Sequence, residues 1–586
     1  MSFYDDASLV FLPSGGAGKD TKAYSIKPTD GSGDFTFSRG SNLTATRVDS
    51  NGLIEKGREN LAENSVWDGV STDTKPTGWS NQFVSGTGTF DVTATEGQIR
   101  FQTLDASSRA FIYSPTITTN GIVVASVYVD EVTTAIPLSN LLIRSANATD
   151  LFAYEDGVEI NYSDNVQANK RYSVVFNKTG STTFRFGVGT SSGVLGDVVL
   201  SKPQIEIGLV ATEWITSPVG SKGLAGILED SPRFDYSGGA SCPSLLLEPS
   251  RTNEIGYSEY FDSWTKQGNI IVNTNEFNSP EGVQNATELD SQDSSNYQAI
   301  LRYLNLSAGT YTFSFFLKKT TGSLSHYAGA VMDSVYKYIV IDTTNGTYSQ
   351  TAGTNYNDFV DIESWDSNWW RVVITNTISA NSSCRFGLYS AISVNGTSIS
   401  PLAIGTNVFY GAQVEQGSYP TSYIPNHSGG SVTREADYSE SSTSLSIGDS
   451  EFCAYYEMDA KAIPRESSAT FFRIEFGSNS HYIGLKGSSN SVNNRYTLPT
   501  LGNYSETINN ITESSGVVKF LINYSNGTGD LFVNGTKYAG VISGPTTGNT
   551  INNIELRGSG YSHDSKQILL FPSALSDAEC ITLTTL

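Results

Sequence analysis

Three tryptophans stand close together in DIESWDSNWW at 361–370, among acidic and amide side chains. An aromatic face stacks on the apolar side of a pyranose ring, while Asp and Asn side chains hydrogen-bond its hydroxyls. The segment therefore predicts a carbohydrate-binding site, with Trp365, Trp369 and Asp366 in contact with the sugar. Other polar residues of the segment are Asp361 and Asn368.

Several other tryptophans are expected in hydrophobic cores. Trp370 stands directly before an Arg-Val strand, a position from which an aromatic side chain packs inward. Trp264 stands near the start of a predicted domain, and Trp67 and Trp79 occupy a similar place in the domain before it. These four residues are structural candidates rather than ligand contacts.

A second candidate site lies in the last third of the chain. His481, Tyr482, Asn534 and Lys537 stand near predicted loops, where a binding residue is held at the surface. Turn formation by Asn534, which precedes a glycine, is the structural alternative. We keep His481, Tyr482 and Asn534 as candidate carbohydrate contacts.

No residue pattern points to catalysis. A glycosidase needs two carboxylates on rigid elements about 5–10 Å apart, and nothing distinguishes one pair among the 59 acidic residues. A nucleophile needs a nearby base, yet the chain has four scattered histidines and no GxSxG motif. GGAGKD at 15–20 lacks the spacing of a phosphate-binding loop. The sequence predicts a protein that is not an enzyme.

Composition and charge narrow the class further. The net charge of −23 and the absence of Lys/Arg runs argue against nucleic-acid binding. No apolar stretch reaches the ~18 residues of a membrane span, and the N-terminus does not resemble a signal peptide. Four widely spaced cysteines favour neither a metal-thiolate site nor a disulfide framework. Abundant aromatic residues and 55 glycines suit strands joined by turns, which predicts an all-β protein.

Three short motifs occur twice in the same order, and the distance in sequence between the two copies grows slowly from the first motif to the third. They are GLIEKGREN at 52–60 with LLLEPSRTN at 245–253, FRFGV at 184–188 with CRFGL at 384–388, and QIEIG at 204–208 with QVEQG at 413–417. Loop insertions cost little free energy, so diverged copies drift in this way. The repeats predict two homologous domains, module 1 (53–220) and module 2 (253–428), with a linker at 221–252.

Strand-like runs at regular spacing predict tandem antiparallel β-sandwiches of the jelly-roll type. Asn345-Gly346 and Asn534-Gly535 mark the tips of two hairpins. A third sandwich is predicted at 429–586. FPSALSDAECITL at 571–583 is its only expected helix, capped by Ser576 or Asp577.

The first 52 residues are rich in Gly, Ser and Thr but contain the strand-like pieces SLVFLP and DFTFSRG. They predict an extended N-terminal arm that becomes ordered on a partner or a neighbouring subunit.

A first block, made of DASLVFLPSG, AYSIKPTDGSGDFTFSRGSN and TRVDSNGLIE, resembles a lead-in of tailed-bacteriophage structural and fibre proteins. A second block, PRFDYSGGASCPSLLLEPSRTN followed by YSEYFDSWTK, resembles it too. In that family the two blocks are usually adjacent, whereas here module 1 stands between them. YSEYFDSWTKQGN, WWRVVIT and QVEQGSYPTSYIP are similar to carbohydrate-binding-module-like jelly rolls of phage proteins. LFVNGTKYAG and FPSALSDAE are similar to concanavalin-like, laminin-G-type sandwiches.

The resemblance implies a virion protein made in the bacterial host cytoplasm, a tail or head fibre or decoration that binds host-surface glycans. It further implies a homo-oligomer, such as a trimer, joined to other virion proteins through the N-terminal arm. Such sandwiches often hold a structural Ca²⁺, although no EF-hand spacing identifies ligands here. A purely structural assembly protein and a glycan depolymerase are the alternatives.

Overall fold

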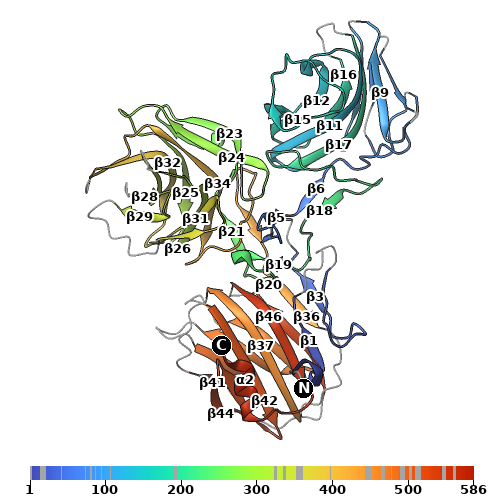
Figure 1. The fold of residues 1–586 in the computed structure, drawn as a ribbon. Coiled ribbons are helices and arrows are strands. Elements are labelled where there is room, and N and C mark those ends of the chain that lie inside the picture. The colour runs from blue at the N-terminus through green and yellow to red at the C-terminus, as the bar shows by residue number, and fades with distance from the viewer. Residues whose placement is uncertain are drawn as a thin grey trace.

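The structure is a computed structural model in which three β-sandwiches meet at a central junction (Figure 1). It describes residues 3–586 apart from 14–20, 41–42, 73, 80–81, 86–87, 94, 106, 190–194, 323–325, 334–337, 351–359, 396–397, 442–449, 463–468, 477, 489–494, 500–504, 509–515, 544–549 and 559–561. The strand pairs of the three sandwiches are antiparallel, so the predicted all-β class is confirmed.

Module 1 packs a four-stranded sheet against a seven-stranded one. The first sheet runs β12 (Leu141–Ser145), β16 (Phe184–Val188), β10 (Arg109–Tyr113) and β7 (Gln82–Ser85). The second runs β14 (Val158–Glu159), β13 (Ala148–Glu155), β15 (Lys170–Lys178), β11 (Gly121–Thr134), β17 (Gly196–Ile207), β9 (Gln98–Thr103) and β8 (Thr89–Val92). Trp67 and Trp79 are buried in the core between the sheets, as predicted.

Module 2 has the same two-layer plan. One sheet runs β22 (Thr265–Gln267), β25 (Ala299–Leu306), β32 (Ser382–Asn395), β27 (Tyr327–Asp333), β28 (Ile339–Asp342) and β29 (Thr347–Gln350), with β33 (Ser398–Ser400) paired to β32. The other runs β23 (Ile271–Asn278), β24 (Gln284–Ser291), β34 (Gly405–Gln416), β26 (Gly309–Lys318), β31 (Trp369–Ile378) and β30 (Val360–Ser364). Trp264 lies in this core, and β28 and β29 form the predicted Asn345-Gly346 hairpin.

The third sandwich is assembled from three separate parts of the chain. Its first sheet runs β19 (Phe234–Asp235), β20 (Ser244–Leu247), β46 (Ser562–Phe571), β37 (Glu451–Ala462), β42 (Gly516–Ser525), β43 (Thr528–Val533) and β44 (Thr536–Ser543), with β1 (Leu9–Phe11) on β46. Its second runs β2 (Lys22–Ala23), β3 (Phe35–Ser38), β36 (Tyr438–Ser441), β45 (Ile551–Arg557), β38 (Ala469–Phe476), β39 (Ser478–Ser488), β40 (Arg495–Pro499) and β41 (Ser505–Ile508).

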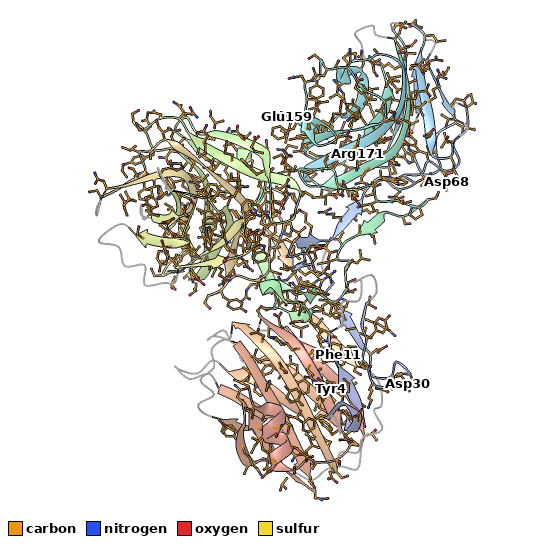
Figure 2. The ribbon with its side chains drawn as sticks, in the orientation of Figure 1. Tyr4, Phe11, Asp30, Asp68, Glu159 and Arg171 are labelled. Atoms are coloured by element: carbon orange, nitrogen blue, oxygen red, sulfur yellow. The ribbon has the colours of Figure 1, made fainter. Side chains whose placement is uncertain are left out.

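The predicted N-terminal arm is therefore corrected. Leu9 and Phe11 pair with the last strand of the chain, Phe35 and Phe37 enter the same core, and all four side chains are buried. Both chain ends lie on the third sandwich (Figure 1), where Tyr4 and Phe11 are labelled in Figure 2. The linker also contributes strands β19 and β20 to this sandwich.

Two short α-helices are described. α1 spans Phe3–Asp6, and α2 spans Asp577–Thr584 with Ser576 as its N-cap. Ser576 and Glu579 form a reciprocal capping box, which bears out the predicted start of this helix. Neither described helix has the length and apolarity needed to cross a bilayer.

Modules 1 and 2 are insertions into the third sandwich, each attached by a two-stranded ribbon. The chain enters module 1 through β6 (Arg58–Asn60), which pairs with the returning β18 (Gly223–Ala225). It enters module 2 through β21 (Arg251–Asn253), which pairs with β35 (Val432–Arg434). The repeated motif GLIEKGREN/LLLEPSRTN thus ends in the ingoing strand of each ribbon. Strands β4 (Thr46–Val48) and β5 (Ile54–Lys56) form a separate hairpin before the ribbon of module 1.

The residues that the repeated motifs share form the same buried hydrogen-bond network in both modules. We call this network, built on Asn60, Glu206 and Thr212 in module 1 and on Asn253, Glu415 and Thr421 in module 2, the polar clasp. Asn60 and Asn253 each donate from the side-chain amide to two backbone carbonyls across the module. Glu206 accepts hydrogen bonds from the backbone and hydroxyl of Thr212 at 2.9 and 2.5 Å, and Glu415 accepts the same pair from Thr421 at the same distances. Because these groups are buried, an unsatisfied partner would be costly.

The integration of the N-terminal segment is testable with Phe11→Ala. Removing this fully buried ring should lower the free energy of unfolding by about 3–5 kcal/mol, since it leaves a cavity beside Phe35. Ile26→Ala is the matched control, because Ile26 is exposed on the same segment and should change stability by less than about 0.5 kcal/mol. Guanidinium denaturation measures the free energy of unfolding of both variants. Equal denaturation curves for Phe11→Ala and wild type would contradict the packing of this segment and favour the predicted separate arm.

Candidate functional site

Five buried charged side chains from distant parts of the chain form an ion network where the sandwiches meet. Arg233 and Arg434 each place a guanidinium nitrogen 2.7 Å from Glu248, and Arg233 also pairs with Asp437. Arg39 reaches Asp437 at 3.3 Å. All five side chains are at most 3% exposed. We refer to these five residues as the buried ion network.

The network is held in the ionised state. Burial alone would raise the pKa of Glu248, but Arg434 and Arg233 outweigh it and hold that pKa far below its usual range. Burial lowers the pKa of Arg39 to about 10, which still leaves the guanidinium charged at neutral pH. Glu248 also accepts hydrogen bonds from the backbone and hydroxyl of Ser422. A carboxylate so held cannot serve as a general acid at neutral pH.

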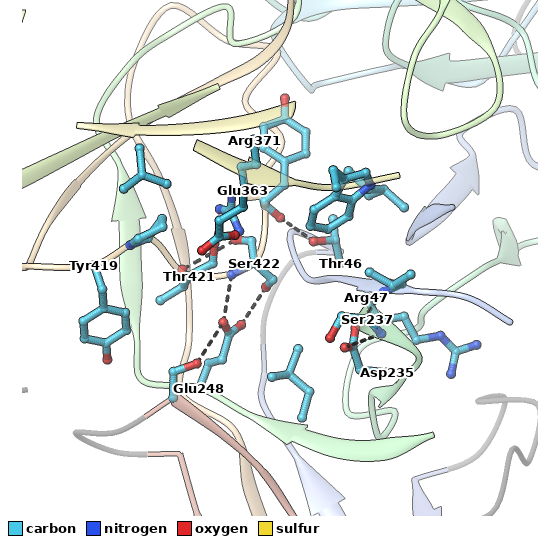
Figure 3. A pocket seen from close by; sticks show the side chains of 18 of the residues that line it. Thr46, Arg47, Asp235, Ser237, Glu248, Glu363, Arg371, Tyr419, Thr421 and Ser422 are labelled. Atoms are coloured by element: carbon cyan, nitrogen blue, oxygen red, sulfur yellow. Dashed lines mark hydrogen bonds between the residues drawn. The ribbon is translucent and has the colours of Figure 1, made fainter. Parts of the chain in front are cut away.

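A pocket of about 420 Å³ opens next to this network (Figure 3). Module 2 supplies one wall, including Asp361, Glu363 and Trp365 and the loop Ser418–Tyr423. The opposite wall comes from the lead-in and the linker, including Thr46, Arg47, Val48, Ile54, Asp235, Ser237 and Leu246. We call this space the junction pocket.

Two aromatic residues of the junction pocket carry buried polar atoms without a protein partner. They are the indole nitrogen of Trp365 and the hydroxyl of Tyr419. Burial raises the pKa of Tyr419 to about 12, so its hydroxyl remains a donor at neutral pH. Glu363 is exposed at the same pocket and Asp361 is half-buried. Aromatic surface, free donors and carboxylates in one concave site are suited to a hydroxyl-rich ligand.

The structure separates the residues predicted from the tryptophan segment. Trp365 lies in the junction pocket and packs edge-on against Phe316 at 5.1 Å. Asp366 instead closes the turn before β31, because its carboxylate accepts from the backbone of Asn368 and Trp369 at 2.6 and 2.8 Å. Asp366 thus has a turn-forming role, and its sugar contact stays a prediction.

The predicted sugar contact of Trp369 is wrong. This residue is 2% exposed and belongs to a cluster with Phe316, Tyr423 and Ile54. Ile54 comes from β5, so the lead-in covers the sheet face toward which Trp369 points. Trp370 is half-buried, and its indole donates to the carbonyl of Thr343 at 2.8 Å.

The candidates in the third sandwich are not brought together into a described site. His481 and Tyr482 lie on β39, and their side chains fall outside the part of the chain that the structure describes. Asn534 has φ 45° at the tip of the β43–β44 hairpin, and its side-chain oxygen accepts from the backbone of Lys519 at 2.8 Å. Lys537 pairs with Asp530 and Asp577. Asn534 therefore has the turn-forming role that was its alternative.

Sequence reasoning missed Arg371 and Tyr419, which also line the junction pocket. Arg371 donates to the carbonyl of Thr421 at 2.5 Å, and Arg171 donates to Thr212 at the equivalent place in module 1. Arg171 and Arg371 are separated by the same number of residues as the FRFGV and CRFGL motifs. This shared offset in the sequence could have identified Arg371 as the counterpart of Arg171.

Within the described residues, no group of three or more His, Cys, Asp or Glu side chains is arranged to hold a metal ion. The structural Ca²⁺ implied by the resemblance stays a prediction.

Comparisons with known proteins leave the family open. Neither a family model nor a curated protein matches the chain. Among solved structures, the chain is similar to the CBM22-1–CBM22-2 tandem domain of Paenibacillus barcinonensis Xyn10C, at 12% identity and a TM-score of 0.21, covering 65% of this chain and 99% of that one. It is also similar to the LG1-3 region of the laminin alpha2 chain, at 7% identity and a TM-score of 0.15, covering 98% and 97%. Likeness at these TM-scores does not assign a function.

The buried ion network predicts acid sensitivity. Because the pKa of Glu248 is lower in the folded than in the unfolded state, ionised Glu248 stabilises the fold above the unfolded value of about 4.3, and this contribution is lost as the pH falls below it. Glu248→Gln should cost about 3–5 kcal/mol at neutral pH, because it leaves Arg434 without this carboxylate and Arg233 with Asp437 alone. It should also flatten the acid side of the plot of unfolding free energy against pH.

Urea denaturation at neutral pH and at about pH 3 measures this effect. Glu276→Gln is the control, since Glu276 is exposed on β23 and lies away from the network. A Glu248→Gln profile that keeps the wild-type slope below about pH 4.3 would show that another group is responsible.

Proposed function

We propose that this chain is a non-enzymatic virion protein of a tailed phage, a tail or head fibre or decoration whose sandwiches bind host-surface glycans. The observation that carries glycan binding is the junction pocket, where Trp365 and Tyr419 combine aromatic surface with buried donors that have no protein partner. The virion setting rests on the resemblance of the lead-in segments to phage structural proteins.

The non-enzymatic reading is supported by how the pocket's buried carboxylate is used. Glycoside hydrolysis needs an acid of raised pKa opposite a second carboxylate, whereas Glu248 is held ionised between two arginines and bound to Ser422. Weak binding at a single pocket suits a protein displayed in many copies, because avidity multiplies the affinity of each site.

A purely structural assembly role is the second candidate function. It is favoured by the buried ion network and by the ribbons of paired strands that hold both modules. A rigid multi-domain spacer needs these contacts and no ligand. Cryo-electron microscopy of intact virions separates the two, since adhesion requires the junction pocket to face outward rather than to be covered by other virion proteins.

A glycan array with Tyr419→Phe and Glu363→Gln tests the pocket. Tyr419→Phe removes only the unpartnered hydroxyl, and Glu363→Gln removes one exposed charge, so both should fold and bind about tenfold more weakly. Glu276→Gln is the control and should bind as wild type. If wild type binds no glycan, the assembly role remains; if it releases reducing ends from host capsule, the protein is a depolymerase.

A further inference from the structure

A second cavity, of about 470 Å³, lies where module 1, module 2 and the lead-in meet. Thr119 and Asn120 with the turn at 206–212 contribute the module 1 wall, and the lead-in contributes 56–59. Module 2 contributes residues between 259 and 428, and the returning strand β35 with its flanks contributes residues between 431 and 435. Exposed Ser431, Thr433 and Glu435 stand among its lining residues, so the cavity communicates with solvent. We call it the side cavity; its lining shares no residue with the junction pocket.

Two buried carboxylates and one lysine form the floor of the side cavity. The ammonium of Lys56 lies 2.6 Å from Glu281 and 3.2 Å from Glu259. Tyr410 donates to Glu281, and Tyr423 donates to Glu259 at 3.1 Å. The two carboxylates are therefore fixed in position. Burial raises the pKa of Glu259, but the charge of Lys56 outweighs it and holds that pKa below its usual value.

Two further side chains of the side cavity each keep a buried atom without a partner. Asn285 is 3% exposed; its amide nitrogen lies 3.3 and 3.5 Å from Glu259 and Glu281, while its carbonyl oxygen has no partner. The side chain of His427 is 7% exposed, with Nε2 3.6 Å from Glu259 and Nδ1 without a partner.

Both unpartnered atoms are acceptors. The amide of Asn285 is oriented by the two carboxylates that its nitrogen faces, so its oxygen is the atom left over. Proximity of His427 Nε2 to Glu259 favours the tautomer with its proton on Nε2, which leaves a lone pair on Nδ1. Burial lowers the pKa of His427, so the ring is neutral at neutral pH.

The charge of the side cavity also favours a ligand that donates hydrogen bonds. Its described lining includes five carboxylates but only two cationic side chains: Glu59, Glu206, Glu259, Glu281 and Glu435 against Lys56 and Arg58. Such a lining disfavours an anion and attracts a cation. A protonated primary amine presents three donors and a positive charge, which matches two free acceptors beside carboxylates.

We propose that the side cavity binds a small ligand through a protonated primary amine, held by the side chains of Asn285 and His427 next to Glu259. The cavity volume admits a ligand of monosaccharide size, so an amino sugar with a free amine fits both the space and the chemistry. This site is separate from the glycan pocket proposed above and does not depend on it.

Isothermal titration calorimetry of the full chain with three probes tests the proposal near neutral pH. Glucosamine carries the free amine, N-acetylglucosamine carries a neutral amide in its place, and glucose carries a hydroxyl. We expect glucosamine to bind at least about tenfold more tightly than the other two probes, which is the gain of about one charge-assisted hydrogen bond. Equal binding of the three probes, or no binding of glucosamine, would overturn the proposal.

Variants locate the site. Asn285→Ala removes a free acceptor and should weaken glucosamine binding about tenfold, while Glu276→Gln, at an exposed residue that lines neither cavity, should leave it unchanged. Unchanged binding in Asn285→Ala, or an equal loss in Glu276→Gln, would place the amine elsewhere and refute the assignment. Thermal denaturation checks that Asn285→Ala folds; if it does not, the comparison of the three probes with wild type decides.

Discussion

The buried ion network is the interaction on which the arrangement of the three sandwiches depends. Arg39 follows β3, Arg233 precedes β19, Glu248 follows β20, and Arg434 and Asp437 flank the step from β35 to β36. Each of these positions lies beside a crossing between the third sandwich and an inserted module. Three guanidinium groups face two carboxylates at side chains at most 3% exposed, so removing either carboxylate leaves positive charge that the interior cannot solvate. The protein is therefore stable only when all the segments that cross the junction are in place and these charges are paired.

Local signals in the sequence were sufficient for most strands and for the C-terminal helix α2. The Asn345-Gly346 hairpin and the Ser576 cap need only neighbouring residues, and both are found as expected. The N-terminal segment was misjudged because its partner strand, β46, lies at the other end of the chain. Its Gly- and Ser-rich composition is that of a loop, while the alternation in Phe35–Ser38, buried and exposed in turn, was the signal of a packed strand.

The candidate site was predicted only in part, for a similar reason. Aromatic content singled out Trp365 and Trp369 together, but the register of β31 and the cover provided by Ile54 bury one while the other lines the pocket. Such cover comes from the lead-in, more than 300 residues away in sequence, and no local pattern encodes it. Arg371 could have been found from its counterpart Arg171, because both close the same clasp in their modules.

The paired ribbons have a consequence for how such a chain can change over time. Each module leaves and rejoins the third sandwich through adjacent strands, so its two ends are neighbours in space. A module with adjacent ends can be lost, duplicated or exchanged without altering the fold of the third sandwich, provided that Asn60 or Asn253 is retained at its base. The chain would then evolve as a constant frame with replaceable inserts, in which new binding surfaces arise by substitution of a whole module rather than by gradual change of one.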